Sequence, residues 1–585
     1  MDHQNMPFQP SFIERTLISI FRFINKFVSW FKLPAILGAL NLAVMRVQLR
    51  GYNLHDGYAS ASAQGSSQDE PMDDERYLNA RHSDGNASWH ANRVALFPAT
   101  TLNLLAAAWI QFQTHDWFNH ELSDESFGVP LPVGDRWSDG RMQLPQTKPD
   151  STLDPFDLKC PGYKNLNTSW WDGSQIYGSS EAATSELRTR NPDGELMVTE
   201  GGIEGFLPRD KEGNPLTGFN NNWWIGMEIL HTLFALEHNS LCDMFRKAYP
   251  NWTGDQIFNK ARLVNCALMA KIHTVEWTPA ILAHPALQIG MNANWWGLAG
   301  EALTKLVGRI SKRSEIISGI PGSGVDHDGI PYSLTEEFVS VYRMHPLIPD
   351  NIAFFNAKDG KHQTTIPIVD VTFQNAQKPF AKGLSFADTF YSFGINYPGA
   401  ITNNNCPNFL RDLTSPDGLH RDMGTVDILR DRERGVPRYC DFRRMLHMHV
   451  PTTFEELTGG NKALATELSE VYNGDIEAVD TLVVSHSEPV IPGFGFSETA
   501  FHIFIIMASR RLKSDRFIAG QWNAVTYTKE GLHWVQHTGM KDVLIRHFPE
   551  LKDTLKKSKN VFAPWAQLGE SKKYKGAETT VSKMP

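Results

Sequence analysis

Cysteine is scarce in this chain. Its 585 residues include five cysteines, and these are widely separated along the sequence: Cys160, Cys242, Cys266, Cys406 and Cys440. No two of them form a CxxC motif. The pattern excludes a small disulfide-rich secreted module and a paired-cysteine zinc site. We expect a reducing, intracellular compartment.

Positive charge is not in excess either. The net charge is −9 and the isoelectric point is about 6.2, so nothing in the composition points to nucleic acid as a partner. The sequence also lacks a glycine-rich phosphate loop and an internal repeat. Nucleotide-binding and solenoid architectures are therefore not expected.

The first 50 residues lack an apolar run long enough to cross a bilayer, and they show no compact apolar core with a cleavage site of the kind that a signal peptide needs. They contain instead one apolar stripe at helical spacing: Ile13, Leu17, Ile20, Ile24, Phe27 and Phe31. Arg15, Arg22 and Lys26 lie on another face, and Pro34 interrupts the helix. Residues 1–50 are thus predicted to form amphipathic helices, which either dock on the domain's own core or lie in a membrane interface.

Strand-like alternation is also sparse. Residues 51–92 are poor in large apolar side chains and are predicted to be an exposed connection. From residue 93 to 585 most segments show three-and-four spacing, and loops such as "VPLPVGDRWSDGRMQLPQTKPD" separate them. Only "TTIPIVDVTF" reads as a clear strand. The expected fold class is mainly α, with a single large domain and few short strands.

A tyrosine and a histidine stand three residues apart in "TEEFVSVYRMHPLIPD". Ser333 and Glu336 form a capping-box pattern that predicts a helix start, and Pro346 predicts that the helix ends near His345. Phe338, Tyr342 and His345 would then share one helical face. Taken alone, such a pair is more often packed in a core than used in a reaction.

A second histidine occurs in "WIQFQTHDWFNH". Gln111 and His115 share a helical face, whereas Asp116 is turned away by about 100°. A histidine facing a haem pocket can transfer the proton of a peroxide, and a carboxylate on the other face suits a hard cation. The pattern also fits an ordinary surface turn.

Oxygen donors alternate in "NTSWWDGS". Thr168, Trp170, Asp172 and Ser174 would face one way in an extended loop. Hydroxyls, carboxylates and backbone carbonyls are ligands that calcium accepts. Loops of this kind are usually structural.

Taken together and in order, "QFQTHDW", "TSWWDGS", "YRMHPLIPD", "LRDRERGVPRYCDFRR" and "SRRLKSDRF" resemble the animal-type haem peroxidase and cyclooxygenase superfamily. Within it the chain most resembles the fatty acid α-dioxygenases, which carry similar versions of "IHTVEWT", "NANWWGL" and "YTKEGLHWV". The likeness runs over essentially the whole chain. It implies an animal haem peroxidase-like helical fold.

The resemblance implies a role for each matching residue. His345 would be the proximal ligand of haem iron and His115 the distal histidine, with Gln111 beside it. Tyr342 would be the radical-forming tyrosine. The carboxylate of a fatty acid would be bound by His273, Thr278 and Arg511, although Arg510 and Arg516 are near alternatives. Calcium would be held by Asp116, Thr168, Trp170 (through its backbone), Asp172 and Ser174.

Departures from the relatives refine this expectation. Peroxidases of the superfamily link haem covalently through an acid beside the distal histidine and through a later Glu-Met pair. Thr114 and Trp223-Trp224 stand at these positions here, so a non-covalent haem b is expected. The scattered cysteines cannot build the disulfide-rich module of cyclooxygenases.

The resemblance implies a haem-dependent enzyme that is activated by a hydroperoxide and uses O2 to convert fatty acids to 2-hydroperoxy acids. Two alternatives remain: a dioxygenase that oxidises a mid-chain carbon, in the manner of a cyclooxygenase or diol synthase, and a plain haem peroxidase. Peripheral, monotopic membrane contact through the N-terminal helices is also expected.

Overall fold

The computed structural model describes residues 10–51, 96–131, 137, 140–151, 162–189, 193–196, 206–311, 314–327, 334–414 and 418–576. Of the predicted exposed connection at 51–92, all but Gly51 lies outside these residues. Cys160 and Ser333 lie outside them as well.

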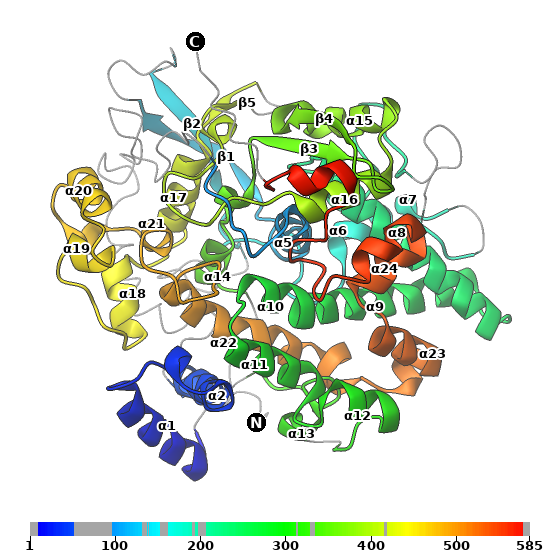
Figure 1. Ribbon diagram of the computed structural model, residues 1–585, viewed down its shortest axis with the longest axis horizontal. Coiled ribbons are helices and arrows are strands. Elements are labelled where there is room, and N and C mark those ends of the chain that lie inside the picture. Colours follow the sequence, from blue (N-terminus) through cyan, green and yellow to red (C-terminus); the bar gives the residue numbers. More distant parts are fainter. Residues whose placement is uncertain are drawn as a thin grey trace.

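The described chain is mainly helical, which confirms the predicted fold class (Figure 1). Its longest helices beyond the N-terminal pair are α5 (Leu104–Trp117), α8 (Ile225–Ala248), α9 (Gly254–Ile272), α22 (Glu498–Ser514) and α23 (Ala524–His537).

Shorter helices connect and cover these. Those before residue 400 are α6 (Ser174–Tyr177), α7 (Glu181–Leu187), α10 (Thr278–Ile281), α11 (Pro285–Trp296), α12 (Gly300–Val307), α13 (Glu315–Ser318), α14 (Glu336–Val341), α15 (Lys378–Ala381) and α16 (Phe386–Ile395). Those after it are α17 (Met423–Glu433), α18 (Tyr439–Met445), α19 (Phe454–Leu457), α20 (Lys462–Val471), α21 (Thr481–Ser485), α24 (Met540–His547) and α25 (Lys552–Leu555).

Helix α5 lies at the centre because it is apolar on almost every side (Figure 1). All of its residues are buried except Gln111 and Thr114. Asn103 caps its N-terminus by accepting a hydrogen bond from the backbone N–H of Ala106, while the Asn103 amide donates to the carbonyl of Val561, 2.7 Å away. Burial of its side chains and the contacts of Asn103 at its N-terminus therefore hold in place the helix that carries His115.

The strands form three two-stranded antiparallel sheets within the described residues. They are β1 (Leu122–Pro130) with β2 (Arg141–Thr147), β3 (Asn351–Phe355) with β4 (His362–Pro367), and β5 (Leu413–Thr414) with β6 (His420–Arg421).

Two details of the strand prediction were wrong. The segment read as the loop "VPLPVGDRWSDGRMQLPQTKPD" contributes to the β1–β2 hairpin, whose buried Val129, Met142 and Leu144 pack in a second core with α17 and α21. Polar and proline residues on its outer face had hidden the alternation. The segment "TTIPIVDVTF" is a strand only as far as Pro367, after which a 3-10 turn begins.

The first 50 residues contain α1 (Phe12–Asn25), the 3-10 turn η2 (Trp30–Lys32) and α2 (Ala35–Gly51). The apolar stripe predicted for one helix is interrupted, because α1 ends at Asn25, before Phe27 and Phe31. Ser11 and Glu14 form a capping box at the start of α1. Ile18 and Phe21 of α1 pack on Val44 of α2. No helix in the described ranges is long and apolar enough to cross a bilayer.

Candidate active site

A cavity lies beside α5 in the middle of the molecule, and both predicted haem histidines line it. His115 comes from α5, and His345 begins the 3-10 turn η6 (His345–Leu347) after α14. Its walls also include Ile110, Leu347 and Phe409, which are apolar. Two histidines separated by 230 residues in sequence are thus brought to one cavity.

The chemistry of the lining suits a haem. Of the described residues that line the cavity none is Asp or Glu, so no carboxyl group is in place to form an ester with a haem edge. Thr114 and Trp224, the residues on which the expectation of a non-covalent haem rests, both line the cavity. The imidazole of His115 is buried, and its Nδ1 has no hydrogen-bond partner within the structure.

His115 is neutral in this environment. Burial lowers its pKa from 6.5 to about 3, so the ring can accept a proton at neutral pH. Gln111, one helical turn earlier, is held at both ends of its amide: it accepts from Trp224 Nε1 at 2.8 Å and donates to the carbonyl of Asn222 at 3.0 Å. Gln111 therefore orders the wall of the cavity next to His115.

The segment with Tyr342 and His345 is not one continuous helix. Helix α14 begins at Glu336 with Thr335 as its N-cap, and the predicted capping position, Ser333, is two residues away from it. The helix ends at Val341, and Tyr342 leaves helical geometry with ψ near 7°. The prediction that Tyr342 and His345 share a helical face was therefore wrong, but the turn brings both residues to the same cavity.

Tyr342 separates this cavity from a second, smaller pocket and lines both of them. Its ring packs edge-on against Trp117, 5.2 Å between ring centres, and against Phe338 at 4.8 Å. Its hydroxyl is buried without a hydrogen-bond partner, and burial raises its pKa. The phenol is thus held as a neutral O–H at the boundary between two pockets.

The second pocket contains the three residues expected to bind a carboxylate. His273, Thr278 and Arg511 line it together with Trp117 and Trp171. The guanidinium of Arg511 lies between the two indoles, 4.2 Å from each ring centre. Stacking holds the planar donor group in one orientation, which is what bidentate binding of a carboxylate requires.

Neither neighbouring arginine reaches this pocket. Arg510 donates to the backbone carbonyl of His327 at 2.8 Å, and Arg516 is exposed after α22 has ended. Of the three arginines in "SRRLKSDRF", Arg511 is the one that lines the pocket with His273.

His273 is the first residue of a short π-helix, η5 (His273–Trp277), and such turns are frequent at functional sites. Trp109 Nε1 donates to His273 Nδ1 at 3.4 Å. This bond makes Nδ1 the acceptor, so Nε2 carries the proton in the neutral ring. Burial and nearby Arg511 hold the pKa of His273 well below its usual value, and the ring remains a neutral donor. The Thr278 hydroxyl donates to the His273 carbonyl at 2.8 Å.

The residues expected to hold calcium lie next to one another where the end of α5 meets the loop before α6. Asp116 Oδ1 accepts from the backbone N–H of Ser174 at 2.6 Å and from its hydroxyl at 2.7 Å. The Thr168 hydroxyl donates to Asp172 at 2.9 Å, and the Trp170 N–H donates to Thr168. Burial and then Asp172 raise the pKa of Asp116 well above its usual value. The described residues contain no cluster of three or more His, Cys, Asp or Glu side chains that could hold a metal.

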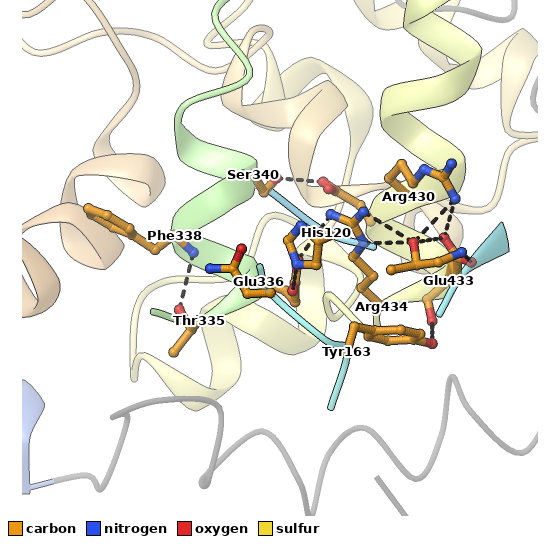
Figure 2. Close-up of polar contacts among 12 residues, drawn as sticks. His120, Tyr163, Thr335, Glu336, Phe338, Ser340, Arg430, Glu433 and Arg434 are labelled. Carbon is orange, nitrogen blue, oxygen red and sulfur yellow. Dashed lines mark hydrogen bonds and ion pairs between the residues drawn. The ribbon is translucent and has the colours of Figure 1, made fainter. Parts of the chain in front are cut away.

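A polar network fixes the start of α14, and sequence reasoning missed it (Figure 2). Glu336 lies 2.6 Å from His120 Nε2, and Arg434, which follows the last residue of α17, contacts its other oxygen at 3.3 Å. Glu433 accepts from the backbone N–H of Thr147 and from Arg430. The network joins the chain after α5 to α14 and α17, which sets where Tyr342 lies relative to His115.

A second missed residue is Asp427 of α17, whose Oδ2 lies 2.6 Å from His345 Nδ1. It stands three residues before the motif "RDRERGVPRY" that carried the resemblance. Nothing in the spacing pointed to it, because α14 and α17 are more than 80 residues apart in sequence.

Comparison with known proteins agrees with this geometry. Residues 59–562 match the family model of the animal haem peroxidases. The chain is 35% identical to α-dioxygenase 2 of Arabidopsis thaliana, over 95% of this chain and 94% of that protein, and 37% identical to an α-dioxygenase of Oryza sativa subsp. japonica, over 79% and 76%.

Solved structures give the same result. The crystal structure of the Arabidopsis thaliana fatty acid α-dioxygenase superposes with a TM-score of 0.84 at 33% identity, covering 95% of this chain and 93% of that one. A variant of the Oryza sativa enzyme, determined with palmitic acid, superposes with a TM-score of 0.83 at 32% identity, covering 95% and 98%. With a haem-type cavity between two histidines and relatives of this length and identity, the chain belongs to the animal haem peroxidase family, and within it to the fatty acid α-dioxygenases.

Proposed function

We propose that this protein is a haem-dependent oxygenase that converts long-chain fatty acids to 2-hydroperoxy fatty acids. The observation that carries the proposal is the position of Tyr342, which lines the histidine cavity on one side and the pocket with Arg511 on the other. Tyr342 would thus lie between the oxidising haem and the residues that bind the carboxylate. The names of the relatives, and the palmitic acid in the rice structure, support this substrate class.

His345 is the residue that would hold the haem iron, because its Nδ1 is engaged by Asp427 and its Nε2 is left for the cavity. When bound, the haem supplies the one-electron oxidising power that a hydroperoxide activator generates. His115, neutral and facing the same cavity, would take the proton of the hydroperoxide and return it to the departing oxygen.

Tyr342 would act as the radical that attacks the substrate. Its oxygen takes a hydrogen atom from the α-carbon of the fatty acid, which breaks a C–H bond and forms the phenol O–H. O2 adds to the carbon radical, and the resulting peroxyl group takes the hydrogen atom back from Tyr342. The products are a 2-hydroperoxy acid and the tyrosyl radical, ready for a new cycle. Loss of CO2 to a shorter aldehyde would follow without the enzyme.

Binding of the carboxylate determines which carbon is attacked. Arg511 offers a planar pair of donors and His273 an Nε2–H, in the pocket that Tyr342 borders. A carboxylate held there places the α-carbon, one bond away, next to the phenol. An anchor at the mouth of a longer channel would instead present a mid-chain carbon.

Oxygen uptake with palmitate tests the proposal. The haem-loaded enzyme should consume O2 and yield 2-hydroperoxypalmitate and a C15 aldehyde, identified by mass spectrometry. A mid-chain dioxygenase needs a weak bis-allylic C–H bond and would leave a saturated acid unchanged. A plain peroxidase would oxidise a small phenol but consume no O2 with palmitate.

We also propose a calcium ion at Asp116, Thr168, Trp170, Asp172 and Ser174. Two carboxylates converge there with two hydroxyls, and a hard cation would offset the burial and the Asp172 charge that raise the pKa of Asp116. The arrangement would tie α5 to the loop that precedes Ser174. Removal of calcium by a chelator should lower the melting temperature, and an unchanged value would contradict the assignment.

Peripheral contact with a membrane is a further part of the proposal. Large apolar side chains are exposed on α1, on the turn that follows it and on α2, among them Phe12, Phe23, Phe27 and Ile36. Helix α11 packs against α2, and others are exposed on α11 and on the following segment through α13: Ile289, Leu298, Leu303, Leu306, Val307, Ile310, Ile316 and Ile317. Arg15, Arg22 and Lys26 add positive charge, which suits anionic lipid headgroups.

Liposome sedimentation tests this contact. Replacement of Phe23 and Phe27 by glutamate should release the protein from anionic liposomes, whereas Phe97→Glu, an exposed phenylalanine outside both segments, should not. Equal sedimentation of the two variants would contradict the proposal. An intracellular location is proposed because the buried cysteines Cys242, Cys266 and Cys440 are free thiols.

A further inference from the structure

Two tryptophans continue a row of aromatic rings that begins at Tyr342. The ring centres of Tyr342 and Trp117 lie 5.2 Å apart, and those of Trp117 and Trp171 lie 5.6 Å apart. The guanidinium of Arg511 lies 4.2 Å from the centre of each indole. Three oxidisable rings are therefore in contact, and a cation lies between the last two.

The two indoles are poorly placed to release a proton. Trp117 Nε1 and Trp171 Nε1 are both buried, and neither has a hydrogen-bond partner among the described residues. An indole that loses an electron while it keeps its N–H becomes a cation. Because charges are weakly screened inside a protein, a new positive charge on either ring would be strongly disfavoured beside Arg511.

Tyr342 differs from the indoles in the charge of its oxidised form. An oxidised phenol is a very strong acid and loses its proton with the electron, so its radical is neutral. An oxidised indole is a weaker acid and can remain a cation. Phenol and indole have similar reduction potentials in water, and Arg511 therefore favours an unpaired electron on Tyr342 over one on Trp117.

We propose that Arg511 confines the radical to Tyr342 by making Trp117 and Trp171 hard to oxidise. The inference rests on the proposed tyrosyl radical and gives Arg511 a second role besides carboxylate binding. The step that it opposes moves one electron from Trp117 to the Tyr342 phenoxyl radical. The phenoxyl oxygen takes one proton from solvent and becomes the phenol again, while Trp117 becomes an indole cation radical.

A bound carboxylate would offset the charge of Arg511. Confinement is therefore strongest when the pocket holds no fatty acid, which is also when no substrate is present to react with the radical. The test is accordingly made without fatty acid, so that loss of carboxylate binding in an Arg511 variant does not affect the result.

Electron paramagnetic resonance of the haem-loaded protein, frozen after reaction with a hydroperoxide, measures where the radical lies. In protein made with ring-deuterated tryptophan, only a tryptophanyl signal becomes narrower. Wild type should give a tyrosyl signal. Arg511→Met removes the charge and should raise the tryptophanyl fraction by at least about 10-fold, whereas Arg511→Lys keeps a charge and should remain tyrosyl. An Arg511→Met signal with the wild-type tyrosyl fraction would overturn the inference.

Peptide mass spectrometry gives a second readout, because an indole radical reacts with O2. Arg511→Met should accumulate oxidised Trp117 and Trp171 during incubation with hydroperoxide. Trp252, which is less buried and lines neither pocket, is the internal reference and should be oxidised equally in both proteins. Equal oxidation of Trp117 and Trp171 in wild type and variant would contradict the proposed confinement.

The wild-type protein alone decides the point if Arg511→Met does not fold. The acid 2,2-difluoropalmitate has no α-hydrogen to lose, and its carboxylate would offset the charge of Arg511. At a concentration that blocks oxygenation of palmitate, it should raise the tryptophanyl fraction of the signal. An unchanged fraction would overturn the inference.

The same spectra distinguish this inference from the proposed function. If the wild-type tyrosyl signal is unchanged in Tyr342→Phe, the radical is not on Tyr342 and both proposals fail. If the signal is altered in Tyr342→Phe but Arg511→Met gives the wild-type spectrum, the confining role of Arg511 fails while the proposed function remains.

Discussion

Glu336 provides a direct test of how α14 is held in place. The substitution Glu336→Gln keeps the size of the side chain and removes the charge that faces His120 and Arg434. Burial alone would raise the pKa of Glu336, but Arg434 and His120 outweigh it and lower the pKa from 4.5 to about 2. The carboxylate therefore stabilises the folded state at neutral pH.

The size of the effect follows from this pKa. A shift of that extent corresponds to about 3 kcal/mol. The side chain is 21% exposed, so screening by solvent reduces the expected value to about 2 kcal/mol. A chain of 585 residues unfolds with an entropy on the order of 1.2 kcal/mol/K. Glu336→Gln should therefore lower the melting temperature at pH 7 by about 2 °C.

The pH dependence has a defined sign. Because the folded pKa is depressed, the stabilisation is complete above pH 4.5 and is lost as the pH falls toward 2. The difference in melting temperature between wild type and Glu336→Gln should shrink by more than half at pH 3. Differential scanning fluorimetry at one scan rate measures it, with Glu186→Gln, an exposed acid on α7, as the control. A difference that is absent at pH 7, or unchanged at pH 3, would refute the reasoning.

Three further predictions concern the reaction and the cation. Arg511→Lys loses the planar pair of donors, so the KM for palmitate should rise by about 10- to 100-fold while oxidation of a small phenol stays unchanged. An equal loss of palmitate oxygenation and of phenol oxidation would contradict the role of Arg511 as an anchor. His115→Gln should slow activation by hydroperoxide by about 100- to 10,000-fold with the haem still bound, as absorbance and the lag in O2 uptake will show. In Asp116→Asn the melting temperature should no longer respond to calcium; a response equal to that of wild type would exclude Asp116 as a ligand.

Helical spacing predicted one part of the site's geometry and not another. His115 and Gln111 share a helical face of α5 as the four-residue spacing indicated, because the helix is regular there. Tyr342 and His345 were placed on one helix, but Pro346 and the preceding turn end α14 at Val341. Their meeting at one cavity depends on that turn, which spacing rules cannot describe.

Contacts between distant segments explain the rest of what was missed. Asp427 contacts His345 because α17 packs against α14. Glu336 contacts His120 because the chain after α5 lies beside the start of α14. A single sequence carries no signal for such pairs. The β1–β2 hairpin was missed for a different reason, since prolines and charged residues on its outer face resemble those of a loop.

The most direct test of the central claim is oxygen uptake with palmitate by the haem-loaded Tyr342→Phe variant. We expect no O2 consumption and no 2-hydroperoxypalmitate, while hydroperoxide-driven oxidation of a small phenol continues. Tyr249→Phe, which removes a hydroxyl bonded to Glu530 away from both pockets, should behave as wild type. If Tyr342→Phe still consumed O2 with palmitate at the wild-type rate, Tyr342 would not be the residue that attacks the substrate.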